Sequence, residues 1–264
     1  MNSPLPFSSL PTWFVFIATL MLSLLSVELG YRRARKRQLR TEQEEEREKE
    51  APVGAMVGTT LGLLAFLLAF TFGMAADAFH ARKMALLEET NAVRITYRLA
   101  GVIPEPHRTD VRQILREYVE DRLHWVGLDK AQESIAATVL LDRLWAHAVA
   151  VGAQSPGGVD EFLGSVARVT EVRAERETVR ERSRIPNDFW LVLYLLAILS
   201  LWSMGYHGGV AGTVRSPVMI AVAISFSLVM VLIADVDSPG HGIVNVSQQP
   251  MVDLRNWLVA ESKR

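Results

Sequence analysis

Hydrophobic and polar residues are strongly segregated along this chain. Four long apolar runs alternate with stretches rich in charge, and they cover about 13–31, 53–79, 189–205 and 217–234. No charged residue stands between Pro52 and Asp77. At about 1.5 Å per residue, helices of these lengths cross, or nearly cross, about 30 Å of hydrocarbon. The pattern therefore predicts four transmembrane helices.

The segment between the second and third apolar runs has the periodicity of amphipathic helices. Apolar residues recur at helical spacing in 111–123, 135–148 and 162–169, and Gly or Pro residues separate these stretches. No part of this segment alternates with a period of two, so we expect no sheet. Because no Gly or Pro intervenes between Phe79 and Leu99, the second span should continue as helix to about Leu99. The predicted fold class is all-α.

This pattern gives a four-part organisation. We expect two spans in residues 1–79 with a charged loop at 32–52, a helical extramembrane domain in 80–185, two spans in 186–236, and a tail in 237–264. The tail carries a short amphipathic stripe, formed by Met251, Leu254, Trp257 and Leu258. This stripe either lies on the membrane surface or packs against the helical domain of the same or a neighbouring subunit.

Charge and composition narrow the classes of partner. The chain has 28 Lys and Arg against 29 Asp and Glu, a net charge of −1, which gives no reason to expect a nucleic-acid partner. It contains no cysteine, which excludes disulfides, thiolate metal sites and cysteine nucleophiles. The densest cations lie between Arg32 and Lys49, which places that loop in the cytoplasm and the helical domain outside. Cations also flank the domain itself, so the side that it faces stays open.

Candidate catalytic and metal-binding residues are few. The six histidines include no pair at the i,i+4 spacing of a zinc-binding helix. Asp235, Asp237 and His241 cluster after the fourth run, where a polar turn is a simpler interpretation than a metal site. Neither a phosphate-binding glycine loop nor a nucleophile elbow is present. We therefore expect no catalysis, no metal and no cofactor, and a membrane enzyme that uses the Asp235 cluster is the weakest hypothesis.

The second apolar run contains a ladder in which every fourth residue falls into one ordered series: Gly54, Gly58, Gly62, Phe66, Phe70 and Met74. Residues at i,i+4 spacing lie nearly above one another on a helix. The glycines either allow close helix packing or line a pore, and the bulky residues either form a constriction that excludes water or contact lipid. Asp77 follows the ladder and is a candidate for a pore entrance.

Several segments resemble the bacterial bestrophin-like family, a membrane domain of unknown function. They are Gly62–Phe72, then Glu89-Thr-Asn-Ala-Val with Tyr97-Arg98, and Asp235-Val-Asp-Ser-Pro followed by Gly242–Pro250. The resemblance implies a distant relation to bestrophins, which are pentameric anion channels with four spans and a narrow apolar neck on the second. On this chain the neck corresponds to Phe66, Phe70 and Met74. The resemblance also implies a cytoplasmic domain, and this sequence has no acidic cluster like a bestrophin calcium clasp.

Residues and resemblance together predict an oligomeric channel in the bacterial inner membrane that conducts inorganic anions through a constriction on the second span. The alternative is a non-conducting membrane scaffold or sensor whose helical domain binds a partner or signal. In that case Phe66 and Phe70 contact lipid or protein, and no water-filled path reaches them.

Overall fold

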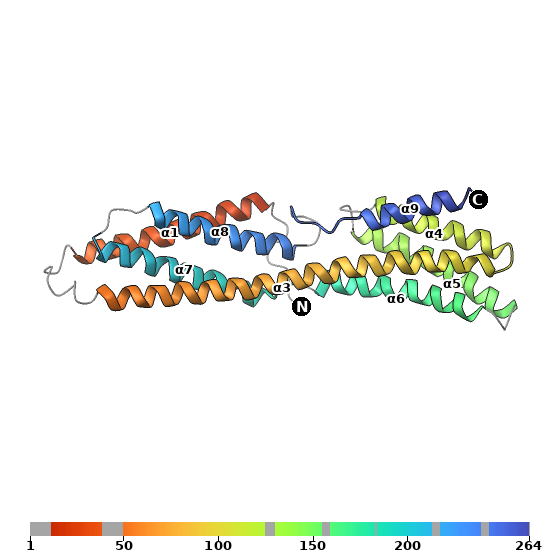
Figure 1. The fold of residues 1–264 in the computed structure, drawn as a ribbon, viewed down its shortest axis with the longest axis horizontal. Helices are drawn as coiled ribbons and strands as arrows, with labels where there is room; N and C mark the ends of the chain where they lie inside the picture. The colour runs from red at the N-terminus through yellow and green to blue at the C-terminus, as the bar shows by residue number, and fades with distance from the viewer. Residues whose placement is uncertain are drawn as a thin grey trace. The chain divides into compact units, whose positions relative to one another are not determined.

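A computed structural model describes residues 12–38, 50–124, 130–154, 159–182, 184–212, 217–238 and 243–263. Within these ranges the regular structure is entirely helical, which confirms the all-α prediction (Figure 1). The helices are α1 Thr12–Gln38, α3 Glu50–Leu99, α4 His107–His124, α5 Lys130–Gln154, α6 Asp160–Arg182, α7 Asn187–Val210, α8 Pro217–Asp237 and α9 Gln249–Glu261, with a 3₁₀ turn at Ala100–Val102. The chain forms two compact units: the first comprises Met1–Asp77 and Arg184–Asn245, and the second comprises Ala78–Ser183 and Val246–Arg264.

Helix α3 is 50 residues long and contributes to both units. It continues without a break from the apolar ladder into the charged segment that follows, as the absence of Gly and Pro between Phe79 and Leu99 predicted. The 3₁₀ turn at Ala100–Val102 ends the helix, and the extended Ile103 and two prolines follow it. One continuous helix therefore carries both the ladder and the residues of the Glu89 motif.

Among the described residues, five helices are long and apolar enough to cross a membrane, one more than the sequence pattern predicted. The fifth is Ile135–Gln154 in α5, inside the segment expected to lie outside the bilayer. Its apolar residues have a second explanation, because Ala137, Leu144, Ala148 and Val151 are fully buried in the core of the second unit. Its exposed face carries Asp142 and Arg143 within an apolar stripe.

The first unit is held together by very close helix packing. A Cβ added at Gly30 would clash with the carbonyl of Trp202, and one at Gly205 would clash with the carbonyl of Val27. Gly209 likewise approaches the backbone of Tyr31. Glycines at these positions let the α1 and α7 backbones come closer than any side chain would permit.

Short hydroxyl side chains supply the remaining specific contacts of the first unit. The hydroxyls of Thr19 and Tyr194 lie 3.0 Å apart, joining α1 to α7, and Ser227 on α8 donates to Ser23 at 3.1 Å. The Ser200 hydroxyl donates to the carbonyl of Thr60 at 3.2 Å, which joins α7 to α3. Such bonds suit an environment in which an unpaired polar group costs several kcal/mol, about 2–7 by transfer data.

The second unit has a core of large side chains. Tyr97, Tyr118, Phe162, Ile114 and Leu144 are among its fully buried members, drawn from α3, α4, α5 and α6. The apolar stripes predicted in 111–123, 135–148 and 162–169 supply much of this core. Removing apolar surface from water is favourable by roughly 25 cal/mol per Å².

Helix α9 completes this core. Met251, Leu254 and Leu258 are buried in it, and the ring of Trp257 meets Tyr97 edge-on at 5.6 Å. Of the alternatives for the tail, the structure shows packing on the helical domain of the same subunit. The amphipathic stripe is therefore used within the chain.

Candidate functional site

The ladder on α3 lies on a face that the subunit leaves open. Phe66 and Phe70 are 66% and 55% exposed, and a Cβ added at Gly58 or Gly62 would meet nothing within 4 Å. Asp77 at the end of the ladder is exposed, whereas Met74 is half-buried. The face is thus continuous from Gly58 to Phe70 and available to lipid, water or another subunit.

Gly54 differs from the other ladder glycines. A Cβ added there would lie 3.0 Å from Nε2 of His207 on α7, so this position packs inside the subunit. The opposite side of α3 is also turned inward, since Leu64, Leu68, Thr71 and Ala75 are all buried. The helix therefore has a packed side of ordinary residues and an open side of ordered glycines and phenylalanines.

An apolar groove in the first unit is lined by Phe72 and not by the ladder phenylalanines. Phe72 borders an apolar groove of about 390 Å³ between α3 and α8, whose other lining residues include Leu68, Ala69 and Val229. Phe70 does not line this groove. The two phenylalanines are both exposed, but they face different surroundings, which makes Phe72 a matched comparison for Phe70.

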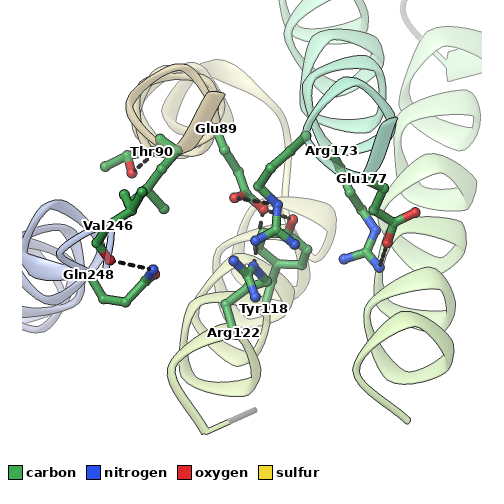
Figure 2. A network of polar contacts seen from close by, with 10 residues as sticks. Glu89, Thr90, Tyr118, Arg122, Arg173, Glu177, Val246 and Gln248 are labelled. Atoms are coloured by element: carbon green, nitrogen blue, oxygen red, sulfur yellow. Dashed lines mark hydrogen bonds and ion pairs between the residues drawn. The ribbon is translucent and has the colours of Figure 1, made fainter. Parts of the chain in front are cut away.

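The second unit contains a buried polar network centred on Glu89, a residue of the family-like motif on α3 (Figure 2). Glu89 is fully buried and accepts a hydrogen bond from the Tyr118 hydroxyl at 2.5 Å. Its carboxylate lies 3.3 Å from Nε of Arg122 and 3.2 Å from Nε of Arg176. The network joins α3, α4 and α6 through one carboxylate.

A further ion pair, between Arg173 and Glu177, lies at the edge of the network. Arg173, also buried, donates to Glu177 one turn later on α6 at 2.8 Å. Burial raises the pKa of the Tyr118 hydroxyl well above its usual value, and the neighbouring Glu89 charge adds to this effect. Tyr118 therefore stays a neutral donor, and a buried carboxylate that is paired in this way rigidifies the junction of three helices.

The carboxylates of Asp235 and Asp237, at the end of α8, accept hydrogen bonds from backbone amides. Asp235 accepts hydrogen bonds from the amides of Ile243 and Val244 at 2.9 and 2.8 Å and from Thr12 at 3.1 Å. Asp237 accepts one from the amide of Ile185 at 3.0 Å. His241 lies outside the described residues. These contacts fit the polar turn that the sequence suggested.

The fold brings two histidines together that sequence spacing did not pair. Nδ1 of His107 on α4 lies 3.0 Å from Nδ1 of His147 on α5, and Asp110 is 4.0 Å from His147. Within the described part of the chain, no set of three or more His, Asp or Glu side chains has the geometry of a metal site. The pair is a polar contact between two helices.

Comparison with known protein families shows to which family this chain belongs. The sequence model of the Bestrophin-like domain matches residues 17–251. The chain belongs to the bestrophin-like family. No curated protein matches it.

Solved structures share the bestrophin-like fold at low sequence identity. A bacterial bestrophin homologue from Klebsiella pneumoniae is 14% identical with a TM-score of 0.59, over 95% of this chain and 98% of that one. A single-residue variant of a Klebsiella pneumoniae homologue gives 12% identity and a TM-score of 0.55, over 96% and 99%. Another solved membrane protein gives 12% identity and a TM-score of 0.57 over 96% and 99%. At such low sequence identity, the similarity to these structures concerns the fold alone.

Two of the segments that carried the bestrophin-like resemblance contain residues with specific structural contacts. Glu89 centres the buried network, Tyr97 is buried beneath Trp257, and Asp235 holds the backbone after α8. Sequence reasoning quoted these residues as a motif without assigning them contacts. It also missed the close-approach glycines Gly205 and Gly209, although their i,i+4 spacing in an apolar run is the signal of close helix packing.

Proposed function

We propose that this bestrophin-like protein is a homo-oligomeric ion channel whose subunits place the open face of α3 around a common axis. The observation that carries the proposal is the free ladder: Gly58, Gly62, Phe66 and Phe70 are exposed, while the opposite side of α3 is packed within the subunit. A helix that lies wholly against lipid has no need for glycines and phenylalanines in this order.

The ladder has the chemistry of a hydrophobic gate. In the assembly, each ladder residue would form a circle with its copies from the other subunits. The glycines leave a wide passage at one end, and the side chains of Phe66, Phe70 and Met74 narrow it further along. A narrow apolar constriction excludes water and therefore ions until the helices shift and widen it. Asp77 then stands at the entrance on the far side of the constriction.

We propose inorganic anions as the conducted ions and a pentamer as the assembly, both on the family resemblance. A ring of Asp77 carboxylates at the entrance favours cations instead. Reversal potentials in unequal KCl solutions discriminate these cases, and the variant Asp77→Asn isolates the contribution of the ring. If cation selectivity persists in both proteins, anion conduction is excluded.

The proposed topology has four spans in the bacterial inner membrane, with the 80–185 segment as an extramembrane domain. Although Ile135–Gln154 is apolar enough to span, its buried face serves the core of the second unit. Asp142 and Arg143 on its exposed face would meet lipid in a fifth span, at a cost of about 2.5–3.5 kcal/mol each at the bilayer centre.

The decisive experiment is ion flux from proteoliposomes containing the Phe66→Ala/Phe70→Ala double variant. Removing both rings widens the constriction, so we expect faster chloride efflux than from the unmodified protein. Phe72→Ala is the matched control, because it removes the same ring from the same helix outside the ladder. Equal efflux from all three correctly assembled proteins contradicts the gate.

Cysteine accessibility separates a channel from a scaffold, and the natural chain contains no cysteine to interfere. Phe66→Cys and Phe70→Cys should react with a membrane-impermeant methanethiosulfonate reagent, whereas Phe72→Cys should not. A non-conducting scaffold that buries the ladder in lipid or protein leaves all three unreactive.

A further inference from the structure

We propose that Arg94, Arg98 and Arg112, arranged around the rings of Tyr97 and Trp257, form a binding site for a phosphate group. The site lies in the second unit and is independent of the proposed pore. Its residues come from α3, α4 and α9, so it exists only when α9 is docked.

The geometry of the cluster is set by the two aromatic rings. The guanidinium carbons of Arg94 and Arg98 lie 5.7 and 5.4 Å from the centre of the Trp257 ring, and that of Arg112 lies 5.1 Å from the centre of Tyr97. The rings themselves are 5.6 Å apart. Cation–π attraction to these two rings restricts the positions of all three guanidinium groups, which lowers the entropy lost when they bind a ligand.

Among the described residues, the three guanidinium groups have no hydrogen-bond acceptor or ion-pair partner. None of the three guanidinium groups donates a hydrogen bond to a described residue, and no described carboxylate lies within ion-pair distance of them. The carboxylate of Glu105 accepts hydrogen bonds from the hydroxyl and amide of Thr109 at 2.9 and 3.2 Å, which lower its pKa, and the charges of Arg108 and Arg112 add to this effect. Two other arginines of the same unit do have carboxylate partners: Arg143 pairs with Glu117, and Arg168 pairs with Glu88 and Glu171.

This combination points to a multivalent oxyanion. Each guanidinium presents five N–H donors in a fixed fork, which matches the oxygens of a phosphate group in bidentate contacts. A phosphate bearing two charges neutralises most of the three positive charges, which a single halide ion does not. Cation–π contacts between the arginines and Trp257 explain how α9 is held, but they leave the N–H donors of the guanidinium groups without acceptors among the described residues.

The phosphate belongs either to a soluble anion or to a lipid headgroup, and two ligands distinguish these sources. Isothermal titration calorimetry on the purified full-length protein in detergent, at constant NaCl, uses sodium pyrophosphate in one arm and dioctanoyl phosphatidic acid in the other. We expect saturable binding in at least one arm. Binding of pyrophosphate identifies a site open to soluble phosphates, and binding of phosphatidic acid alone identifies a headgroup site.

The test variant is Arg94→Gln/Arg98→Gln, and its matched control is Arg143→Gln/Arg168→Gln, which removes two charges from paired arginines of the same unit. The test variant should bind about tenfold more weakly or worse, and the control should bind like the natural protein. Arg98→Glu, a reversal at one exposed side chain, repeats the test with little risk to folding. The proposal is overturned by no binding in either arm, or by equal binding in test and control variants of native melting temperature.

Discussion

In the first unit, α1 and α7 meet where Gly30 and Gly205 have no side chain, and hydroxyl pairs such as Ser23 and Ser227 supply the polar contacts. In the second unit, α3, α4 and α6 meet around large buried side chains and the charged centre of Glu89. Both units are purely helical in the described residues, yet the contacts between their helices are of different kinds.

Lipid and water favour different contacts between helices. In lipid, burying apolar side chains yields little, so helices associate through close backbone packing and short hydrogen bonds. In water, burial of apolar surface drives packing, and the resulting core holds a buried charge only if partners satisfy it. This contrast supports the proposed topology, in which the first unit lies in the membrane and the second lies outside it.

Glu89→Gln is the sharpest way to break the second unit, with the largest expected effect. It leaves Arg122 and Arg176 without their buried carboxylate, and breaking such a pair costs about 3–5 kcal/mol. Amide hydrogen exchange should accelerate in α4 and α6 and stay unchanged in α1 and α7. Glu88→Gln, one residue away but half exposed, should leave exchange unchanged. If both variants changed hydrogen exchange equally, the buried network would not be what stabilises the second unit.

Tyr118→Phe should have the next largest effect. It removes one hydrogen bond to a buried charge, which is worth about 1.5–3 kcal/mol in the free energy of unfolding. The variant also changes the dependence on pH. Because burial raises the pKa of Tyr118 in the folded state, its contribution is fully present below the unfolded pKa near 10 and is lost as pH rises above it.

Melting temperatures measured from pH 8 to pH 11 check this prediction. The natural protein should lose stability more steeply above pH 10 than Tyr118→Phe, since only the natural protein must keep that hydroxyl protonated. Parallel curves for the two proteins would show that Tyr118 does not titrate differently on unfolding.

Gly205→Ala tests the close packing of the first unit. The added Cβ would collide with the backbone carbonyl of Val27, and forcing α1 and α7 apart should cost about 1–3 kcal/mol. Gly73→Ala is the matched control, because a Cβ there meets nothing within 4 Å. Melting of the detergent-solubilised proteins should show a lower temperature for Gly205→Ala alone. An unchanged melting temperature would mean that α1 and α7 separate at no cost.

Ser23→Ala should have the smallest effect of the series. It removes one of two acceptors that share the single hydroxyl hydrogen of Ser227, and the carbonyl of Ala223 at 2.8 Å remains. Bonds of this kind in membranes are worth about 0.6 kcal/mol on average. Ser225→Ala, whose hydroxyl bonds only within α8, serves as the control. If Ser23→Ala lowered stability as much as Glu89→Gln does, the two units would not differ in how their helix contacts contribute to stability.

Much of the fold follows from local sequence. Hydrophobic runs located the helices α1, α7 and α8, and the absence of Gly and Pro located the continuation of α3 to Leu99. The ladder is also a local feature, because i,i+4 spacing alone aligns its members on one face. Its exposure in the folded subunit depends on which side of α3 the other helices cover.

The candidate sites depended on distant parts of the chain. Glu89 and its partners are separated by 29 residues for Tyr118 and 33 for Arg122. The arginine cluster forms because α9 brings Trp257 to Tyr97, and nothing in the local pattern chose that docking over a membrane surface. Spacing along one helix likewise says nothing about His107 and His147, which lie on different helices.

The sequence by itself determined which segments are helical, which are apolar enough for a bilayer, and that one stripe of α3 is ordered from glycine to phenylalanine. These properties arise from interactions within a few turns of one helix. Only the tertiary structure decided which glycines let helices touch, which carboxylate is buried among arginines, and where the tail packs. Those outcomes are set by close packing and charge pairing between residues far apart in the chain, and local periodicity contains no information about such partners.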